Sequence, residues 1–152
     1  MAKYLEVGFN RRANYDYEIL EKIEAGVVLR GTEVKSLRAH RVSLADSYAG
    51  LSRNGEVFLY QMHIPEYALA YRTNHEPKRA RKLLLRKRQI SRLMGQLKKG
   101  GLTLVPISVY FNEKGFVKIS MGLGKGKKTI DKREAIKERE WNREKLRLLK
   151  KH

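Results

Sequence analysis

The chain has 152 residues, enough for about one folded domain. Its 34 lysine and arginine residues outnumber 16 aspartate and glutamate residues, giving a net charge of +18. This charge favours binding to polyanions, chiefly nucleic acid, with an anionic membrane surface as a second possibility. The absence of cysteine excludes disulfides, thiolate metal sites and thiol nucleophiles.

No segment of the sequence is typical of a membrane span or a secretion signal. No window reaches the roughly 18 consecutive apolar residues that a spanning helix needs. The first twenty residues also lack the continuous apolar stretch of a signal peptide. We therefore expect a soluble protein of the cytoplasm, with no membrane partner.

Templates for metal sites and for phosphate-binding enzymes are absent from the sequence. The four histidines are far apart, and His75-Glu76 does not begin an H-E-x-x-H motif. The glycine run that ends at Gly126 has neither the spacing nor the Ser or Thr of a phosphate-binding loop. Carboxylates such as Asp16, Glu24, Glu33 and Asp46 could lie in pairs, but among so many cations most of them are expected to form structural ion pairs. The sequence thus predicts no enzyme, no metal and no cofactor.

The first predicted elements lie in the N-terminal third of the chain. Residues 14–31 alternate in hydrophobicity and are interrupted at Gly26, which predicts two strands or one bulged strand. Val34, Leu37 and Arg38 follow at helical spacing and predict a short helix. Asn54-Gly55 then stands between two alternating apolar runs, the pattern of a β-hairpin.

A helix and a second hairpin complete the predicted body. Residues 90–97 place apolar side chains at i, i+3, i+4 and i+7 before a Gly-Gly stop, which predicts an amphipathic helix. Residues 102–123 predict a hairpin that turns over residues 112–115. Pro106 should place its strand at a sheet edge or at a bulge, because proline lacks the N–H that a central strand needs.

These elements predict a mainly β protein with short α-helices. Five or six strands in hairpin connection suit a small antiparallel barrel of the OB-like class. Almost all the apolar residues that could form a core precede Gly122, and residues 122–126 are rich in glycine, so a flexible joint is expected there. The predicted division is a barrel over residues 1–124 and a basic C-terminal tail over residues 125–152, which holds twelve basic and five acidic side chains.

Three basic clusters stand out: Arg11-Arg12, residues 77–88 and the beginning of the tail. In residues 77–88 seven cations flank three leucines, so several phosphates could be neutralised by one anchored segment. Tyrosines near this charge, such as Tyr15, are candidates for base stacking, although alternating tyrosines in a strand more often belong to the core. The alternative for each cluster is a solvated face that only keeps the protein soluble.

Several linked motifs resemble one known family. The run GTEVKSLR begins at Gly31, with EAG before it and DSY after it; RKLLL, TLVP, GKK and DKR then follow in order. This combination resembles the SsrA-binding protein (small protein B) family, and the similarity covers nearly the whole chain. The resemblance implies an OB-like barrel with a basic C-terminal tail.

The resemblance also implies a function in trans-translation. The barrel would bind the tRNA-like domain of transfer-messenger RNA (tmRNA, or SsrA RNA) and deliver it to bacterial ribosomes stalled without a stop codon. The tail would enter the decoding centre and the empty mRNA channel of the 16S rRNA. Elongation factor Tu, carrying the aminoacylated tmRNA, would be an indirect partner. The protein itself is expected to be a monomer and to perform no chemistry.

Two sets of candidate site residues follow from the clusters and the resemblance. The set expected to bind tmRNA is Arg11, Arg12, Tyr15, Glu24, Lys35, Arg38, Lys78, Arg79, Arg81, Lys82, Leu84 and Arg86. The set expected to bind the ribosome is Gly126, Lys127, Lys128, Asp131, Lys132, Arg133, Trp141, Leu148 and Leu149. Ile130 and Arg86 depart from the usual family pattern, which puts base stacking at the first and a specific hydrogen bond at the second in doubt.

The tail is predicted to be a helix that folds on its partner. Asp131 is a suitable N-cap, and acidic and basic residues recur three apart along the segment. Its apolar seam is narrow, so the free tail should not form a stable helix alone. A general RNA-binding or ribosomal protein is the alternative function, and a basic tail with no defined contact is the alternative for the segment. A membrane-surface role is less favoured, because interfacial helices need a broad apolar face.

Overall fold

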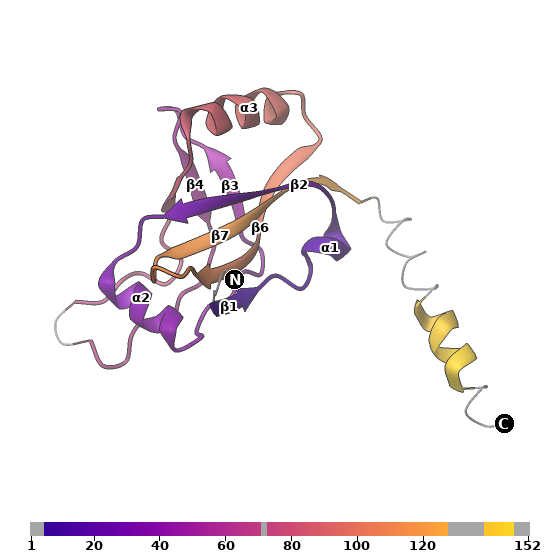
Figure 1. Ribbon diagram of the computed structural model, residues 1–152, viewed down its shortest axis with the longest axis horizontal. Helices are drawn as coiled ribbons and strands as arrows, with labels where there is room; N and C mark the ends of the chain where they lie inside the picture. The colour runs from indigo at the N-terminus through magenta and orange to yellow at the C-terminus, as the bar shows by residue number, and fades with distance from the viewer. Residues whose placement is uncertain (1–4, 71–72, 128–138, 148–152) are drawn as a thin grey trace.

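A computed structural model describes residues 5–70, 73–127 and 139–147 of the chain. Within these residues one antiparallel sheet is built from strands β1 (Leu5–Phe9), β2 (Tyr17–Val27), β3 (Tyr48–Leu51), β4 (Val57–Tyr60), β5 (Arg81–Leu84), β6 (Leu102–Phe111) and β7 (Val117–Gly126) (Figure 1). The helices of the body are α1 (Ala13–Asp16), α2 (Gly31–Arg38) and α3 (Lys87–Lys98).

The sheet closes into a barrel. Its strand order is β1-β6-β3-β4-β5-β2-β7, and β7 pairs again with β6, so the six strands from β6 round to β7 form a ring. β1 lies outside this ring, along the second half of β6, where Leu5 pairs with Phe111 and Phe9 with Ser108. The predicted small antiparallel barrel with short helices is confirmed.

The predicted hairpins and helices are confirmed in position. β3 and β4 join over Gly55 and β6 and β7 over Gly115, with φ of 76° and 81°, a left-handed conformation that suits glycine. Pro106 lies at a register shift between β6 and β7. Of the two predicted positions for this proline, the bulge is therefore correct and the edge is not, since β6 has neighbours on both sides.

Three elements differ from the prediction. β1, β5 and α1 were not expected, because each is short and its apolar pattern is interrupted by glycine or by charged residues. Tyr15 lies in α1 rather than in an alternating strand. Of the two alternatives predicted for residues 14–31, the single bulged strand is correct, but the register shift of β2 lies between Ile19 and Glu21 and not at Gly26.

The predicted flexible joint is wrong. Gly122 and Gly124 are buried in the middle of β7, where they pair with β2 on one side and with β6 on the other. A Cβ atom at Gly122 would lie 2.8 Å from Ile107 Cδ1, and one at Gly124 would lie 2.9 Å from Tyr17 Cβ. The glycines therefore allow neighbouring side chains to pack over the strand, and the division of the chain into two domains remains a prediction.

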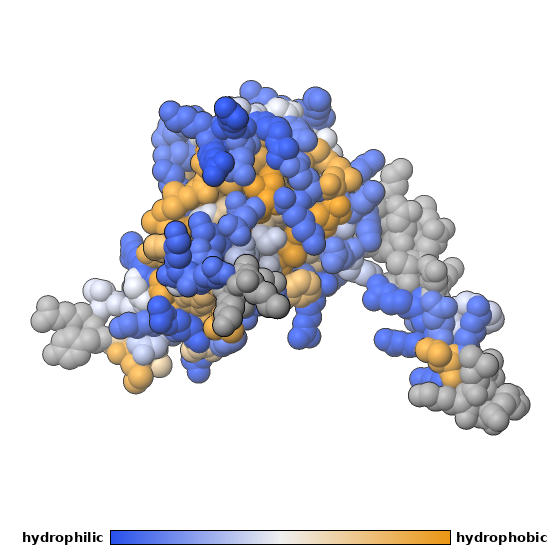
Figure 2. All heavy atoms as spheres, in the orientation of Figure 1, coloured by the Kyte–Doolittle hydropathy of each residue, from blue (hydrophilic) through white to orange (hydrophobic). Residues whose placement is uncertain are grey.

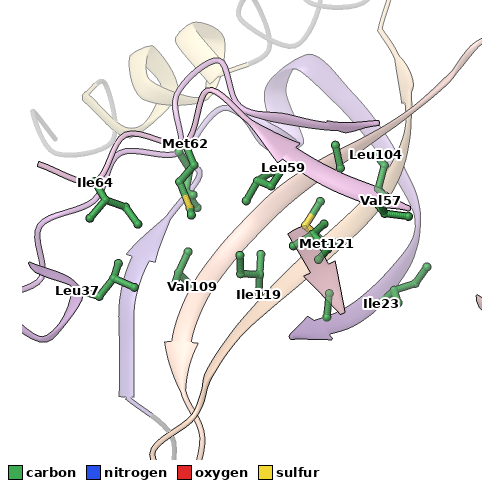
Figure 3. Close-up of a cluster of buried hydrophobic side chains, with 14 of the residues drawn as sticks. Ile23, Leu37, Val57, Leu59, Met62, Ile64, Leu104, Val109, Ile119 and Met121 are labelled. Carbon is green, nitrogen blue, oxygen red and sulfur yellow. The ribbon is translucent and has the colours of Figure 1, made fainter. Parts of the chain in front are cut away.

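The apolar core fills the barrel and extends under its helices. Figure 3 shows Leu59, Ile119 and Met121 together in the interior, and all three are at most 1% exposed. Leu37 of α2 and Leu93 of α3 are both fully buried. Figure 1 shows α3 lying across one end of the barrel, with α2 near the other.

Residues 139–147 form a helix that lies outside the barrel (Figure 1). All of its side chains are exposed, so it belongs to no hydrophobic core within the described chain. The start of the predicted tail helix at Asp131 lies outside the described residues. No helix in the described part of the chain is long and apolar enough to cross a membrane.

Candidate nucleic-acid interface

A buried carboxylate anchors α2 to the segment that leads into β5. Glu33 is fully buried, and its carboxylate accepts hydrogen bonds from Arg79, from Arg81 and, at 2.8 Å, from the backbone N–H of Arg30. Burial alone would raise the pKa of this carboxyl. The bonds from Arg79, the Arg30 backbone and Arg81 outweigh burial and leave the pKa below its ordinary value.

Arg81 is the fully buried partner of Glu33. Besides its bond to Glu33, its Nη1 donates to the carbonyl of Met62 at 2.5 Å and its Nη2 donates to the carbonyl of Pro77 at 3.0 Å. Burial lowers the pKa of this guanidinium, against the opposing effect of Glu33. Arg81 therefore belongs to the core rather than to the RNA-binding surface that the sequence predicted.

Two further buried polar groups hold the same helix. The His75 ring lies 2.9 Å from Thr32 Oγ1 through Nδ1 and 2.8 Å from the carbonyl of Ile64 through Nε2. Ser36 Oγ donates to the carbonyl of Pro65 at 2.8 Å. The polar residues of the GTEVKSLR run therefore chiefly hold α2 in place. The structural ion pair expected at Glu33 is confirmed by its contacts with Arg79 and Arg81.

A groove of about 760 Å³ lies beside β2, β5 and the start of α3. It brings together four of the predicted tmRNA-binding residues, from elements far apart in sequence: Glu24, Lys82, Leu84 and Arg86. Leu84 is 51% exposed, and it packs against the backbone of Gly26, where a Cβ atom would lie 3.2 Å from Leu84 Cβ. The groove therefore presents an apolar side chain among charged ones.

The charges of the groove are partly paired within the protein. Lys82 Nζ lies 3.3 Å from Glu56 Oε1, and both side chains are about two-fifths exposed. Glu24 accepts a hydrogen bond from the hydroxyl of Tyr110. Sequence reasoning missed the other charged and polar residues that line the groove, which no compact motif marks: Glu21, Lys22, Glu56, Gln89, Arg92 and Lys118.

Lys78 and Arg79 lie outside this groove. Lys78 is exposed, whereas Arg79 is partly buried by its ion pair with Glu33 and donates from Nη2 to the carbonyl of Val28 at 3.4 Å. Within the described residues Arg79 Nε is buried and has no hydrogen-bond partner. Arg79 therefore acts at least in part as a structural cation.

A second cluster of predicted RNA-binding residues lies beside the beginning of the tail and contains Arg11, Arg12 and Tyr15. The Arg12 guanidinium lies 5.5 Å from the centre of the Tyr15 ring and 3.5 Å from the Asp16 carboxylate, which confirms an ion pair there. Lys127 lies next to this cluster, because its Nζ donates a hydrogen bond to the carbonyl of Asn14 at 2.7 Å. Two predicted sets, one for tmRNA and one for the ribosome, therefore meet at α1.

The last two predicted RNA-binding cations, Lys35 and Arg38, lie on α2. The Lys35 amine lies 5.5 Å from the centre of the Tyr67 ring, and the Arg38 guanidinium lies 5.6 Å from that of Phe111. Both cations are exposed and do not line the groove. They also do not line a second hollow, to which Arg11 and Arg12 contribute. Figure 2 shows that hydrophilic residues also cover α3 at the top of the view.

The structure describes only some of the residues that were predicted to bind the ribosome. Gly126 ends β7, and the Lys127 backbone N–H donates to the carbonyl of Asp16 at 2.9 Å. Trp141 is 57% exposed, with the Lys145 amine 5.1 Å from the centre of its ring. The remaining predicted tail residues lie outside the described residues: Lys128, Asp131, Lys132, Arg133, Leu148 and Leu149.

Comparison with known proteins gives one consistent result. The family described as "SmpB protein" matches residues 7–151. An SsrA-binding protein of Wolbachia (strain wRi) is 56% identical over 141 residues, covering 93% of this chain and 94% of that protein. An SsrA-binding protein of Rhodospirillum rubrum is 54% identical over 145 residues, covering 95% of this chain and 90% of that one.

A solved structure agrees with the sequence relatives. The chain superposes with a TM-score of 0.69 on a chain of the structure described as "tmRNA-SmpB: a journey to the center of the bacterial ribosome". The two chains are 48% identical, and the match covers 88% of this chain and 94% of the other. The chain therefore belongs to the SmpB family, as the motifs around Gly31 and Arg81 predicted.

Proposed function

We propose that this protein binds tmRNA through the tRNA-like domain of that RNA and delivers it to stalled bacterial ribosomes for trans-translation. Relatives more than half identical are named SsrA-binding proteins, and the similar solved structure is a tmRNA-SmpB complex. The observation that carries the proposal is the groove, where Glu24, Lys82, Leu84 and Arg86 meet from separate elements.

The chemistry of the groove suits structured RNA. Lys82 and Arg86 offer cations to phosphates, while the exposed Leu84 offers an apolar contact to a base or a ribose. The Glu24 carboxylate repels phosphate, so its partners on RNA are donors: the amino group of a base or a ribose 2′-hydroxyl. The cations of the groove therefore attract RNA, and the Glu24 carboxylate restricts the orientation in which the RNA can bind.

The tail has a separate role in this proposal. Lys127 fixes the point at which the chain leaves the barrel, through two hydrogen bonds to α1. Beyond it, the basic segment is proposed to enter the decoding centre and the empty mRNA channel of the ribosome, where 16S rRNA phosphates supply countercharge. Trp141, exposed on the described helix, would then gain an apolar or stacking contact.

The proposed role requires no catalytic residue in this chain. The family is one of RNA-binding proteins, and the reaction that adds the tag to a nascent chain would occur on the ribosome. Elongation factor Tu would meet the protein only through aminoacylated tmRNA. Work on the ribosome would place the protein in the cytoplasm.

The test is a titration of the protein against three RNAs: the tRNA-like domain, an ordinary tRNA and an RNA duplex of equal length, at two salt concentrations. We expect a preference for the tRNA-like domain of about 4 kcal/mol, roughly a thousandfold, that survives the higher salt. Equal affinities that fall together with salt would instead indicate a general RNA-binding protein.

A further inference from the structure

Three aromatic side chains lie together on the outer face of β3 and β4. The ring centres of Tyr48 and Tyr60 are 5.4 Å apart, and those of Phe58 and Tyr60 are 6.4 Å apart. Tyr48 pairs with Tyr60 across the two strands, and Phe58 lies two residues before Tyr60 on the same face. We call Tyr48, Phe58 and Tyr60 the aromatic ladder.

The ladder does not serve the barrel interior. Tyr48 is 45% exposed, and Phe58 and Tyr60 are partly exposed, whereas the alternate residues Ala49 and Leu59 are buried. Gly50 lies opposite Phe58, and a Cβ atom there would lie 3.4 Å from Tyr60 Cε2. The absence of a side chain at Gly50 thus lets the Tyr60 ring lie close over the backbone of β3.

Cations flank the ladder at both ends. Lys82 of β5 pairs with Phe58 of β4, and Lys82 also lines the groove beside β2. At the other end, Tyr48 lines a second hollow of about 730 Å³, together with Arg11 and Arg12. The ladder therefore connects the proposed RNA groove with the arginine cluster at α1.

We propose that the aromatic ladder is a base-stacking surface for unpaired nucleotides of the same RNA that occupies the groove. Aromatic rings give a stacking platform for splayed bases, and the flanking cations receive the phosphates on either side. The proposal rests on the proposed function for the identity of the RNA and adds to it a second contact surface.

Unpaired RNA fits this surface better than other occupants. Bases inside a duplex are already stacked and cannot lie on the rings, so only splayed nucleotides use the ladder. Lys82, Arg11 and Arg12 favour a polyanion over a protein surface of ordinary charge. Glu56, which pairs with Lys82 at 3.3 Å, would release that cation when a phosphate arrives.

A tryptophan reporter tests the contact directly. Trp141 is the only tryptophan, so Trp141→Phe gives a background in which Tyr48→Trp places one indole on the ladder. The tRNA-like domain is added while complex formation is followed separately by gel shift. We expect the fluorescence of Tyr48→Trp to be quenched as the complex forms, and that of the control Phe116→Trp to stay unchanged. Phe116 is 63% exposed and lines neither hollow.

The outcomes separate the two proposals. A complex without quenching of Tyr48→Trp would overturn the ladder and leave the proposed function intact. The same holds if only ribosomes quench the indole, because the occupant would then be ribosomal RNA. No complex at all with the tRNA-like domain would contradict the proposed function itself, and the ladder with it.

Removal of the rings gives a second measurement. Tyr48→Leu combined with Tyr60→Leu keeps apolar side chains but removes both stacking faces. We expect the affinity for the tRNA-like domain to fall roughly tenfold or more, with no change in its salt dependence, since stacking releases no counterions. By contrast, Lys82→Gln should reduce the slope of log affinity against log salt by about 1. Unchanged affinity in the folded double variant, checked by thermal melting, would overturn the proposal.

Discussion

At the scale of single residues, Glu33 and Arg81 link the fold to the proposed RNA-binding groove. Both are fully buried, and their ion pair fastens α2 to the beginning of β5, the strand that carries Lys82 and Leu84 into the groove. Loss of one member of a buried pair leaves the other as an uncompensated charge. This loss lowers the free energy of unfolding by more than the intact pair contributes to it. The residues proposed to bind RNA therefore depend on an ion pair that is itself fully buried.

The first prediction concerns Glu33→Gln. Removal of this charge leaves Arg81 buried and unpaired, so the free energy of unfolding at pH 7 should fall by about 3 to 5 kcal/mol. Urea unfolding gives the value. The partly exposed carboxylate Glu56, which pairs with Lys82, is the control, and Glu56→Gln should cost no more than about 1 kcal/mol.

The same pair predicts how stability depends on pH. Because folding lowers the pKa of Glu33, its contribution is present above the ordinary glutamate pKa and is lost as pH falls through the folded value. We expect the difference between the wild type and Glu33→Gln to be constant near neutrality and to shrink below about pH 4. A difference that stays the same down to pH 2 would show that the carboxylate charge is not what stabilises α2.

A further residue-scale prediction concerns Tyr110. Its hydroxyl donates to Glu24 and thereby orients that carboxylate at the groove. Tyr110→Phe should weaken binding of the tRNA-like domain about fivefold, equivalent to one hydrogen bond of about 1 kcal/mol, with no change in salt dependence. Titration at two salt concentrations measures both. If Tyr110→Phe binds as the wild type does, the orientation of Glu24 is not set by Tyr110.

The sequence allowed the basic cluster to be recognised but not the role of each cation. In β5 the residues alternate, with Arg81 and Leu83 facing the core and Lys82 and Leu84 facing outward. A period of two in the RKLL run would have separated the buried arginine from the exposed lysine, had the segment been recognised as a strand. Without that assignment, all the cations of residues 77–88 appeared equally available for phosphate.

At the scale of elements, β7 shows why composition misleads at the C-terminal end of the barrel. Glycine is rare in strand interiors because it adds no side chain and loses entropy on folding, so a glycine run usually indicates a joint. Here Gly122 and Gly124 are required because the side chains of Ile107 and Tyr17 lie over them. The hairpin itself was predictable from its turn and its alternation, whereas this close packing also depends on Tyr17 and Ile19 of the β2 neighbour, which the local sequence does not specify.

The element-scale prediction compares two glycines of β7. Gly124→Ala should lower the free energy of unfolding by about 1 to 3 kcal/mol, because its Cβ would lie 2.9 Å from Tyr17 Cβ. Gly126→Ala is the matched control, since a Cβ there meets nothing within 4 Å and should leave stability unchanged or slightly raised. Equal effects of the two substitutions in urea unfolding would contradict the packing role of Gly124.

At the scale of the whole molecule, the last residues of β7 bear on the predicted boundary between barrel and tail. The sequence predicted a boundary after residue 124, but Lys125 and Gly126 still pair with β2, and Lys127 bonds to α1. A chain that ends after Gly124 should therefore lose about 1 to 3 kcal/mol of stability relative to one that ends after Lys127, because several hydrogen bonds are removed. Thermal melting compares the two chains, and equal stability would support the predicted boundary after residue 124 instead.

The most direct measurement of the two-part mechanism uses the chain that ends after Lys127, assayed for binding and for ribosome rescue with the same tmRNA. Binding of the tRNA-like domain should stay within a few fold of the full chain, because the groove and the ladder are retained. Tagging of nascent chains on stalled ribosomes should be abolished, because the segment proposed to enter the mRNA channel is gone. Equal loss of binding and rescue, or rescue without the tail, would contradict the separation of the two functions.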